Sequence, residues 1–183
     1  MQSNQKQKAF MDAYENCHQP FLRYCSAIAF GKMDVEDLVQ DVLLSAYHHF
    51  NTIKEKDKLL HYLIRAARNR SISILRKQKH KTEWVEKHTQ HLLAKGVAAD
   101  TLLDIQLLYQ AINHLPEQQA SALILFEING FSMKEIAEIQ NTTEAAVKMK
   151  VSRGRKRLKI FLSDDTPMNN SGILLSVIKS ILL

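Results

Sequence analysis

Apolar residues recur at intervals of three and four positions along most of the chain, which is the spacing that buries one side of an α-helix. This pattern predicts helices over residues 6–30, 34–50, 59–75, 101–115, 116–130, 132–140 and 142–162, and a short apolar helix over 173–183. The chain has only five glycines and three prolines, and Pro20 is a candidate break within the first segment. We therefore predict an all-α fold with short turns.

Residues 82–100 divide the chain, because helical periodicity is lost there and Gly96 interrupts the segment. We interpret this segment as a linker between two small helical domains, over residues 1–81 and 101–163. A tail over residues 164–183 carries the last amphipathic helix. Domains of this size have hydrophobic cores that are only marginally large enough for stability.

The second domain carries several signals for helix boundaries. Pro116 predicts a helix start at a first helical position, and Gly130 predicts the end of that helix. Ser132 and Glu135 have the spacing of a capping box in front of a short helix. Asn141 then provides a tight turn before a longer basic helix. This order is typical of a helix-turn-helix, whose second helix enters the major groove of DNA.

Residues 142–162 are strongly basic, and no acidic residue occurs between Ala145 and Leu162. We expect one side of this helix to pack on the core through Val147, Val151, Gly154, Leu158 and Phe161. The opposite side presents Met149, Ser152, Arg153 and Lys156. Cations suit phosphates, whereas Met149 and Ser152 indicate a surface that also meets base edges. A solvated basic helix without a partner is the alternative interpretation.

A second basic block lies in residues 58–82, which contain no acidic residue. His61, Tyr62 and Asn69 are interleaved with its arginines and lysines. Stacking surfaces, amides and cations together are typical of a surface for single-stranded nucleic acid. For Tyr62 taken alone, burial in the core is the alternative. The two separate basic blocks indicate two contacts with one polyanion.

The helix over residues 34–50 begins with Asp34, a good N-cap residue, and has two different sides. Its core side is Val35, Leu38, Val39, Val42, Ala46 and Phe50. The other side aligns Asp37, Gln40, Asp41 and Leu44, so that acids surround an exposed leucine. We interpret this side as a docking surface for a partner helix. The alternative is an acidic first turn that complements the helix dipole, with one stray apolar residue.

Composition excludes several classes of function. The formal charge of +6 favours an anionic partner. Cys17 and Cys25 have no metal or redox spacing, and no run approaches the roughly 20 apolar residues that span a bilayer. His88 and His91 lack further ligands for a metal, and no phosphate loop or catalytic constellation is present. We expect a soluble cytoplasmic protein without membrane insertion, cofactor, metal, small-molecule substrate or enzymatic activity.

Three motifs, in this order, resemble the bacterial sigma factors of the sigma-70 family and, within them, the extracytoplasmic-function (ECF) branch. They are DVEDLVQDVLLSAY, LIRAARNRSISILRK and LPEQQASALILFEINGFSMKEIAEIQNTTEAAVKMKVSRGRKRL, and the resemblance covers roughly residues 10–162. It implies that residues 1–81 are sigma region 2, a helical bundle, and that residues 101–163 are sigma region 4, the helix-turn-helix. A sigma factor binds core RNA polymerase, directs it to promoter DNA and assists DNA melting, and anti-sigma factors are further partners.

The resemblance also implies roles for individual residues. Core RNA polymerase would be bound by Asp37, Gln40, Asp41 and Leu44. The minus-10 element would be bound by Asn51, Lys54, Lys58, Tyr62, Arg65, Arg68, Asn69 and Arg76. The minus-35 element would be bound by Thr143, Lys148, Met149, Lys150, Ser152, Arg153 and Lys156. Tyr62, Met149 and Lys150 depart from the residues usual in the family, so we expect the DNA contacts there to differ in detail.

A stand-alone helix-turn-helix transcriptional regulator is the alternative function. Such a regulator binds duplex DNA and does not join core polymerase. It has no need for an acidic docking helix followed by a basic helix that contains aromatic residues. These two elements in the first half of the chain therefore favour the sigma factor.

Overall fold

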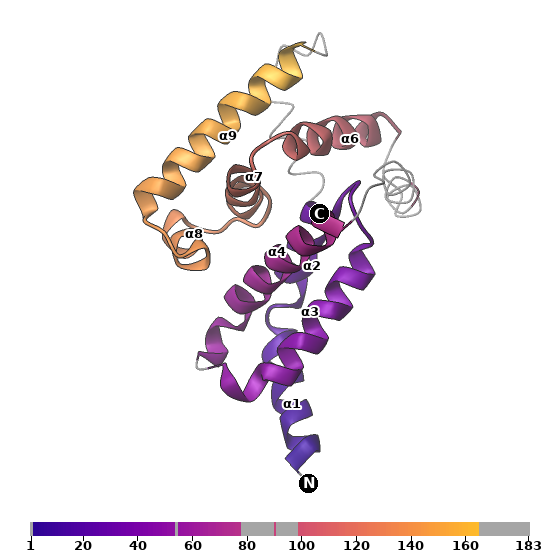
Figure 1. The fold of residues 1–183 in the computed structure, drawn as a ribbon, viewed down its shortest axis with the longest axis vertical. Helices are drawn as coiled ribbons and strands as arrows, with labels where there is room; N and C mark the ends of the chain where they lie inside the picture. Colours follow the sequence, from indigo (N-terminus) through magenta and orange to yellow (C-terminus); the bar gives the residue numbers. More distant parts are fainter. Residues whose placement is uncertain (1, 54, 78–89, 91–98, 165–183) are drawn as a thin grey trace.

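The computed structural model describes residues 2–53, 55–77, 90 and 99–164, and the described elements are helical, as predicted (Figure 1). The N-terminal elements are α1 (Gln2–Glu15), α2 (His18–Ala29), α3 (Val35–His49), the short 3₁₀ helices η1 (Phe50–Thr52) and η2 (Lys56–Lys58), and α4 (Leu59–Lys77). The C-terminal elements are α6 (Ala99–Asn113), α7 (Glu117–Leu123), the π-helical turn η3 (Ile124–Ile128), α8 (Met133–Gln140) and α9 (Glu144–Asp164).

The N-terminal domain packs α2, α3 and α4 around large apolar side chains. Phe21, Leu38, Phe50 and Leu63 are at most 1% exposed. Gly31 adopts a positive φ of 66° after α2, and Asp34 caps α3 by accepting from the backbone N–H groups of Glu36 and Asp37. These two signals fix where α2 ends and where α3 begins.

The C-terminal domain forms the predicted helix-turn-helix from α8 and α9. Ser132 and Glu135 make the reciprocal capping box at the start of α8. Asn141 ends α8 in the left-handed conformation with φ 50°, which asparagine tolerates better than most residues. Gly154 lies close to α7: a Cβ at this position would be only 3.2 Å from Cδ1 of Leu123. The absence of a side chain there lets α7 and α9 approach closely.

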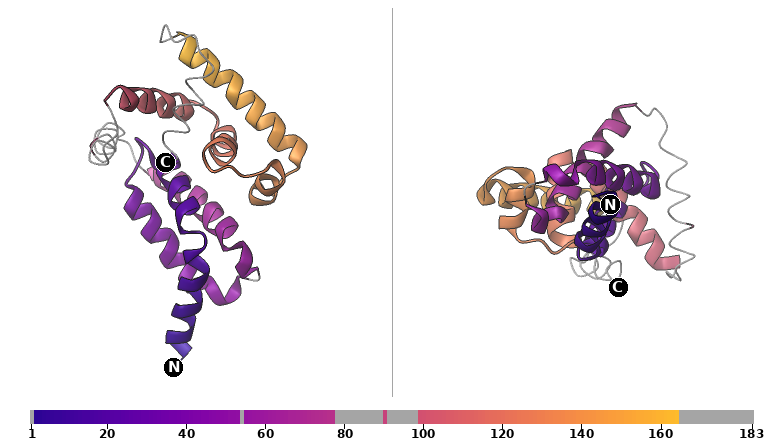
Figure 2. Two further views of the ribbon diagram at one scale, coloured as in Figure 1. Left: turned by 180° about the vertical axis from the view of Figure 1, so that it is seen from behind. Right: turned by 90° about the horizontal axis from the view of Figure 1, so that it is seen from below.

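The two domains pack on each other and share one apolar core (Figures 1 and 2). The α2 helix contacts η3, and α4 contacts α8. The rings of Phe30 and Tyr109 are stacked with their centroids 4.4 Å apart. The hydroxyls of Tyr24 and Ser121 lie 3.2 Å apart within the buried interface. The sequence did not predict this packing, because a linker leaves the relative position of its domains open.

Several predicted boundaries are wrong in detail. Helix α6 begins at Ala99 rather than at 101, and Pro116 is the N-cap of α7 rather than its first helical residue. The break between α1 and α2 precedes Pro20, which lies in the first turn of α2. Proline is tolerated there because the first N–H groups of a helix have no intrahelical acceptor.

Phe161 does not belong to the buried side of α9, since it is 38% exposed. The last turns of α9 extend beyond α7 (Figure 1), and the Phe161 ring stacks on His114 with a centroid distance of 4.8 Å. Val147, Val151 and Leu158 are at most 1% exposed, as predicted. The tail helix over residues 173–183 and most of the predicted linker lie outside the described residues.

Candidate functional surfaces

One surface lies on the outer side of α3. Asp37, Gln40 and Asp41 are exposed, and Leu44 is 59% exposed although it is a large apolar side chain. Leu38, Val42 and Ala46 bury the other side of the same helix. We call Asp37, Gln40, Asp41 and Leu44 the acidic stripe. The structure therefore brings together all the residues predicted for polymerase binding.

Arg70 of α4 contacts the acidic stripe, which the sequence did not predict. Its Nε and Nη2 atoms donate to Oδ2 of Asp41 over 2.9 and 2.6 Å. The two residues are 29 positions apart, so no local spacing signals the pair. Arg70 belongs to the second basic block, but in this structure it orients an acid of the neighbouring helix.

A second surface lies on α4 and the segment before it. Arg65, Asn69 and Arg76 are exposed and follow each other at intervals of four and seven residues, which places them on one side of the helix. Tyr62 is half-buried and packs against the core, so the alternative interpretation, burial in the core, accounts for part of this side chain. Asn51 is exposed in η1, and Lys54 lies outside the described residues.

Two cations of this surface are already paired with acids of the C-terminal domain. Arg68 donates from Nε and Nη2 to the two carboxylate oxygens of Glu117, and the Nη2 to Oε2 distance is 2.6 Å. Lys58 Nζ lies 3.4 Å from Oε2 of Glu138. These hydrogen bonds raise the pKa of both cations, because each stabilises the charged form. Both side chains therefore keep their positive charge and are held by the C-terminal domain of the same chain.

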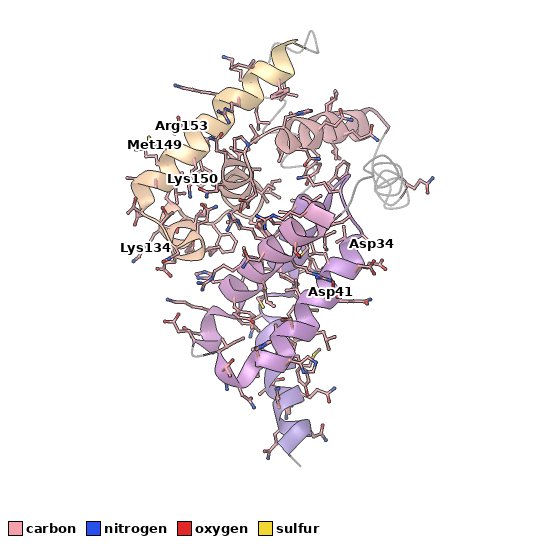
Figure 3. The ribbon with its side chains drawn as sticks, viewed as in Figure 1. Asp34, Asp41, Lys134, Met149, Lys150 and Arg153 are labelled. Carbon is pink, nitrogen blue, oxygen red and sulfur yellow. The ribbon has the colours of Figure 1, made fainter. Side chains whose placement is uncertain are left out.

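The third surface is the outer side of α9. Lys148, Ser152 and Lys156 are exposed, together with Met149, which is 54% exposed, and Arg153. Figure 3 shows Met149 and Arg153 on the outer side of α9. Thr143 is also exposed, and its Oγ1 caps the helix by accepting from the N–H of Ala146 over 3.2 Å. A basic helix with an exposed mixed stripe fits entry into a major groove.

Lys150 differs from the other residues predicted on α9. It is half-buried, and its Nζ donates to Oε1 of Gln140 over 2.8 Å. Loss of hydration lowers the pKa of Lys150, and the neighbouring charge of Arg68 lowers it further. Lys150 is therefore turned toward Gln140 of α8 in this conformation, although it lines one groove together with Met149 and Arg153.

The α3 and α9 surfaces face different sides of the molecule, with Asp41 on one side and Met149 and Arg153 on the other (Figure 3). The view from behind also shows α9 lying away from α3 (Figure 2). One protein partner on α3 and one nucleic acid on α9 can therefore be bound without competing for space.

Within the described residues there is no group of three or more histidine, cysteine, aspartate or glutamate side chains placed to hold a metal ion. The helices of that part of the chain are too short or too polar to cross a membrane.

Comparison with known families matches two regions of the chain. Residues 13–81 match the family model of sigma-70 region 2, and residues 105–158 match that of sigma-70, region 4. The chain belongs to the sigma-70 family. The region 2 match coincides with the N-terminal domain, which carries the acidic stripe and the α4 surface. The region 4 match coincides with the C-terminal domain, which carries α9.

Individual relatives belong to the ECF branch. The chain is 28% identical over 171 residues to the ECF RNA polymerase sigma factor SigW of Bacillus subtilis, covering 86% of this chain and 91% of SigW. It is 29% identical to the ECF RNA polymerase sigma factor EcfG of Rhodopseudomonas palustris, covering 80% and 81%. A solved structure, the sigma factor RpoE with the anti-sigma factor NepR from Bartonella quintana, is 28% identical with a TM-score of 0.62. That match covers 85% of this chain and 99% of RpoE.

Proposed function

We propose that this protein is an ECF sigma factor that joins core RNA polymerase and directs it to promoters with distinct minus-35 and minus-10 elements. The observation that carries the proposal is the presence of three surfaces in one chain: the acidic stripe, the basic α4 surface and the outer side of α9. A factor of this kind contributes binding and orientation to initiation and is not itself an enzyme. It acts in the cytoplasm, where promoter DNA and polymerase are located.

The acidic stripe binds core polymerase. Leu44 supplies an apolar anchor: burying a fully exposed leucine contributes about 1.5–3 kcal/mol, and Leu44, which is 59% exposed, can contribute roughly half of that. Asp37 and Asp41 supply charge around it, which favours a basic partner and fixes the orientation of docking. This combination explains an exposed leucine that the fold of the protein alone does not need.

The α9 helix reads duplex DNA, and the α4 surface holds the strand that is being opened. Arg153, Lys148 and Lys156 contact phosphates and base edges upstream, while Arg65, Arg76 and Asn69 contact the unpaired strand. Melting requires that bases leave the stack, which costs a few kcal/mol for each extruded base, and strand binding by α4 offsets this cost.

The test of the function is transcription in vitro. Purified bacterial core polymerase is incubated with the protein and fragmented genomic DNA, and the 5′ ends of the transcripts are sequenced. We expect initiation sites that share two sequence elements at a fixed spacing and that core polymerase alone does not use. A set of start sites indistinguishable from that of core alone would contradict the proposal.

A second test separates the sigma factor from a stand-alone helix-turn-helix regulator. Asp41→Lys reverses a charge within the acidic stripe, and Glu36→Lys reverses a charge at an exposed position of the same helix outside the stripe. The Asp41–Arg70 pair is about half exposed on both sides, so its loss costs under about 1 kcal/mol and the fold persists. We expect recovery of core polymerase in a pull-down to fall for Asp41→Lys alone. Equal recovery of both variants would favour the regulator.

An anti-sigma factor is a further expected partner of this chain. The similar sigma factor RpoE was solved in complex with the anti-sigma factor NepR. A protein that covers the acidic stripe or holds the two domains together would prevent assembly with polymerase.

A further inference from the structure

Arg70 lies on a different side of α4 from the residues that face nucleic acid in the proposed function. Those residues, Arg65, Asn69 and Arg76, follow each other along one side of the helix. Arg70 is turned away from Asn69 by about 100°, the angle that each residue adds in an α-helix. Its guanidinium reaches Asp41 of α3 instead. This position separates Arg70 from the DNA surface and joins it to the acidic stripe.

The pair of Asp41 and Arg70 leaves polar groups available to a partner. Nε and Nη2 of Arg70 both donate to the same oxygen, Oδ2 of Asp41, over 2.9 and 2.6 Å. In the part of the chain that the structure describes, Nη1 of Arg70 and Oδ1 of Asp41 have no hydrogen-bond partner. The side chains of Arg70 and Asp41 are 45% and 44% exposed. The pair therefore offers N–H donors and a carboxylate oxygen side by side at the edge of the acidic stripe.

Docking on the acidic stripe removes water from this pair. Asp41 lies three positions before Leu44 on α3, so a partner that buries Leu44 also covers Asp41 and the guanidinium bound to it. An N–H donor that is buried without an acceptor is costly, and hydrogen bonds from a guanidinium to a carboxylate are among the strongest in proteins. A partner surface made only of basic groups would leave the donors of Arg70 unpaired and would repel its charge.

We propose that Arg70 contacts core RNA polymerase directly, and that the polymerase presents a carboxylate to Arg70 beside the basic group that it presents to the acidic stripe. The inference rests on the proposed function for the identity of the partner. The docking surface is then mixed in charge, because Asp37 and Asp41 attract a cation while Arg70, on the α4 side, attracts an anion. Opposite charges at fixed positions favour one orientation of the partner and disfavour the reverse one.

The experiment measures the affinity of full-length variants for purified bacterial core polymerase, without DNA and at fixed low salt. Arg70→Gln removes the cation and keeps a polar side chain. Lys8→Gln is the matched control, because it removes one positive charge from an exposed position on α1 of the same domain. The pair of Asp41 and Arg70 is about half exposed, so the fold should persist without it, and circular dichroism of each variant checks this.

The direction of the change in affinity distinguishes the two kinds of partner surface. We expect Arg70→Gln to bind core polymerase about three- to tenfold more weakly than Lys8→Gln, as for the loss of a charge pair across an interface. A purely basic partner surface would have the opposite effect: Arg70→Gln would bind more tightly, because the acidic stripe becomes more negative. Equal or tighter binding by Arg70→Gln would overturn the proposal.

A second comparison tests whether Arg70 acts only by holding Asp41 in place. Asp41→Asn keeps an oxygen that can accept from Arg70, and it is compared with Asp41→Asn/Arg70→Gln. A direct contact predicts that Arg70→Gln still weakens binding at least about twofold in this background. No further loss would refute the direct contact, because Arg70 would then act through Asp41 alone.

Binding by the unchanged protein separates this proposal from the proposed function. If the unchanged protein binds core polymerase and Arg70→Gln binds equally well, only the contact of Arg70 is refuted. If the unchanged protein does not bind core polymerase, the proposed function is refuted and the contact falls with it.

Discussion

The hydrogen bond between Tyr24 and Ser121 is expected to stabilise the domain interface measurably. Tyr24 is fully buried and Ser121 is only 4% exposed, and their hydroxyl oxygens lie 3.2 Å apart. Burial raises the pKa of Tyr24, so its hydroxyl stays protonated and polar at all physiological pH values. In Ser121→Ala this hydroxyl loses the partner that the structure gives it inside an apolar interface.

A buried hydroxyl left without its partner costs about 1–3 kcal/mol, whereas removing both partners of a hydrogen bond is nearly neutral. We therefore expect Ser121→Ala to lower the free energy of unfolding by about 1–3 kcal/mol. Tyr24→Phe should cost less, because Ser121 keeps its contact with Gln140. The double variant Tyr24→Phe/Ser121→Ala should be about 1 kcal/mol more stable than the sum of the two single losses predicts, because no hydroxyl is then left without its partner.

Urea unfolding followed by circular dichroism measures these differences for the four proteins of the cycle. Ser45→Ala is the control, because Ser45 is exposed on α3 and its change should stay within about 0.5 kcal/mol. A loss below that limit for Ser121→Ala would refute the reasoning. So would additive losses in the double variant, since they would show that the two hydroxyls do not interact.

Three further predictions concern a cap, a thiol and the DNA surface. Ser132→Ala should cost about 1 kcal/mol in thermal unfolding, because the capping box is lost. The Ser132 hydroxyl also lowers the pKa of Glu135, so the ionised Glu135 stabilises the folded protein above pH 4.5 and this stabilisation is lost as the pH falls. In Ser132→Ala the free energy of unfolding should therefore fall less on acidification than in the unchanged protein. Burial raises the pKa of Cys17 from 9.0 to about 11, so the contribution of this thiol to the free energy of unfolding should be constant below pH 9 and fall as the pH rises toward 11. Cys17→Ala should reduce the fall in the free energy of unfolding between pH 9 and pH 11. An unchanged fall would show that Cys17 does not cause it. Arg153→Ala should weaken promoter binding by the holoenzyme by about 1–3 kcal/mol, whereas Lys159→Ala should weaken binding to all DNA sequences alike. A binding-site selection compares the sequence preferences of the two variants. Equal preferences would show that the DNA-facing side of α9 was assigned wrongly.

Local features of the fold were predictable because their partners are neighbours in the chain. The Asp34 cap, the Ser132–Glu135 capping box and the left-handed Asn141 each involve groups within three or four residues of one another. The buried side of α9 was equally readable from its periodicity up to Leu158. Phe161 was not, because periodicity indicates which side of a helix is apolar but not where the neighbouring helix ends.

The candidate surfaces were predictable only as sets of residues on one side of one helix. The members of the acidic stripe lie on one side of α3 because of their spacing in the sequence, and all of them are exposed. Pro20 illustrates the opposite case: a proline signals a break, but whether it lies within a helix or in its first turn depends on how the preceding residues fold.

The sequence by itself determined the helices, most of their caps and the division of polar and apolar sides, because these depend on interactions over one or two turns. Only the tertiary structure decided that Asp41 meets Arg70, that Glu117 meets Arg68 and that Tyr24 meets Ser121, pairs that are 29, 49 and 97 positions apart. Side chains with ordinary local patterns are brought together there by the packing of whole helices. The buried area of those helices, rather than any pair of residues, fixes the arrangement.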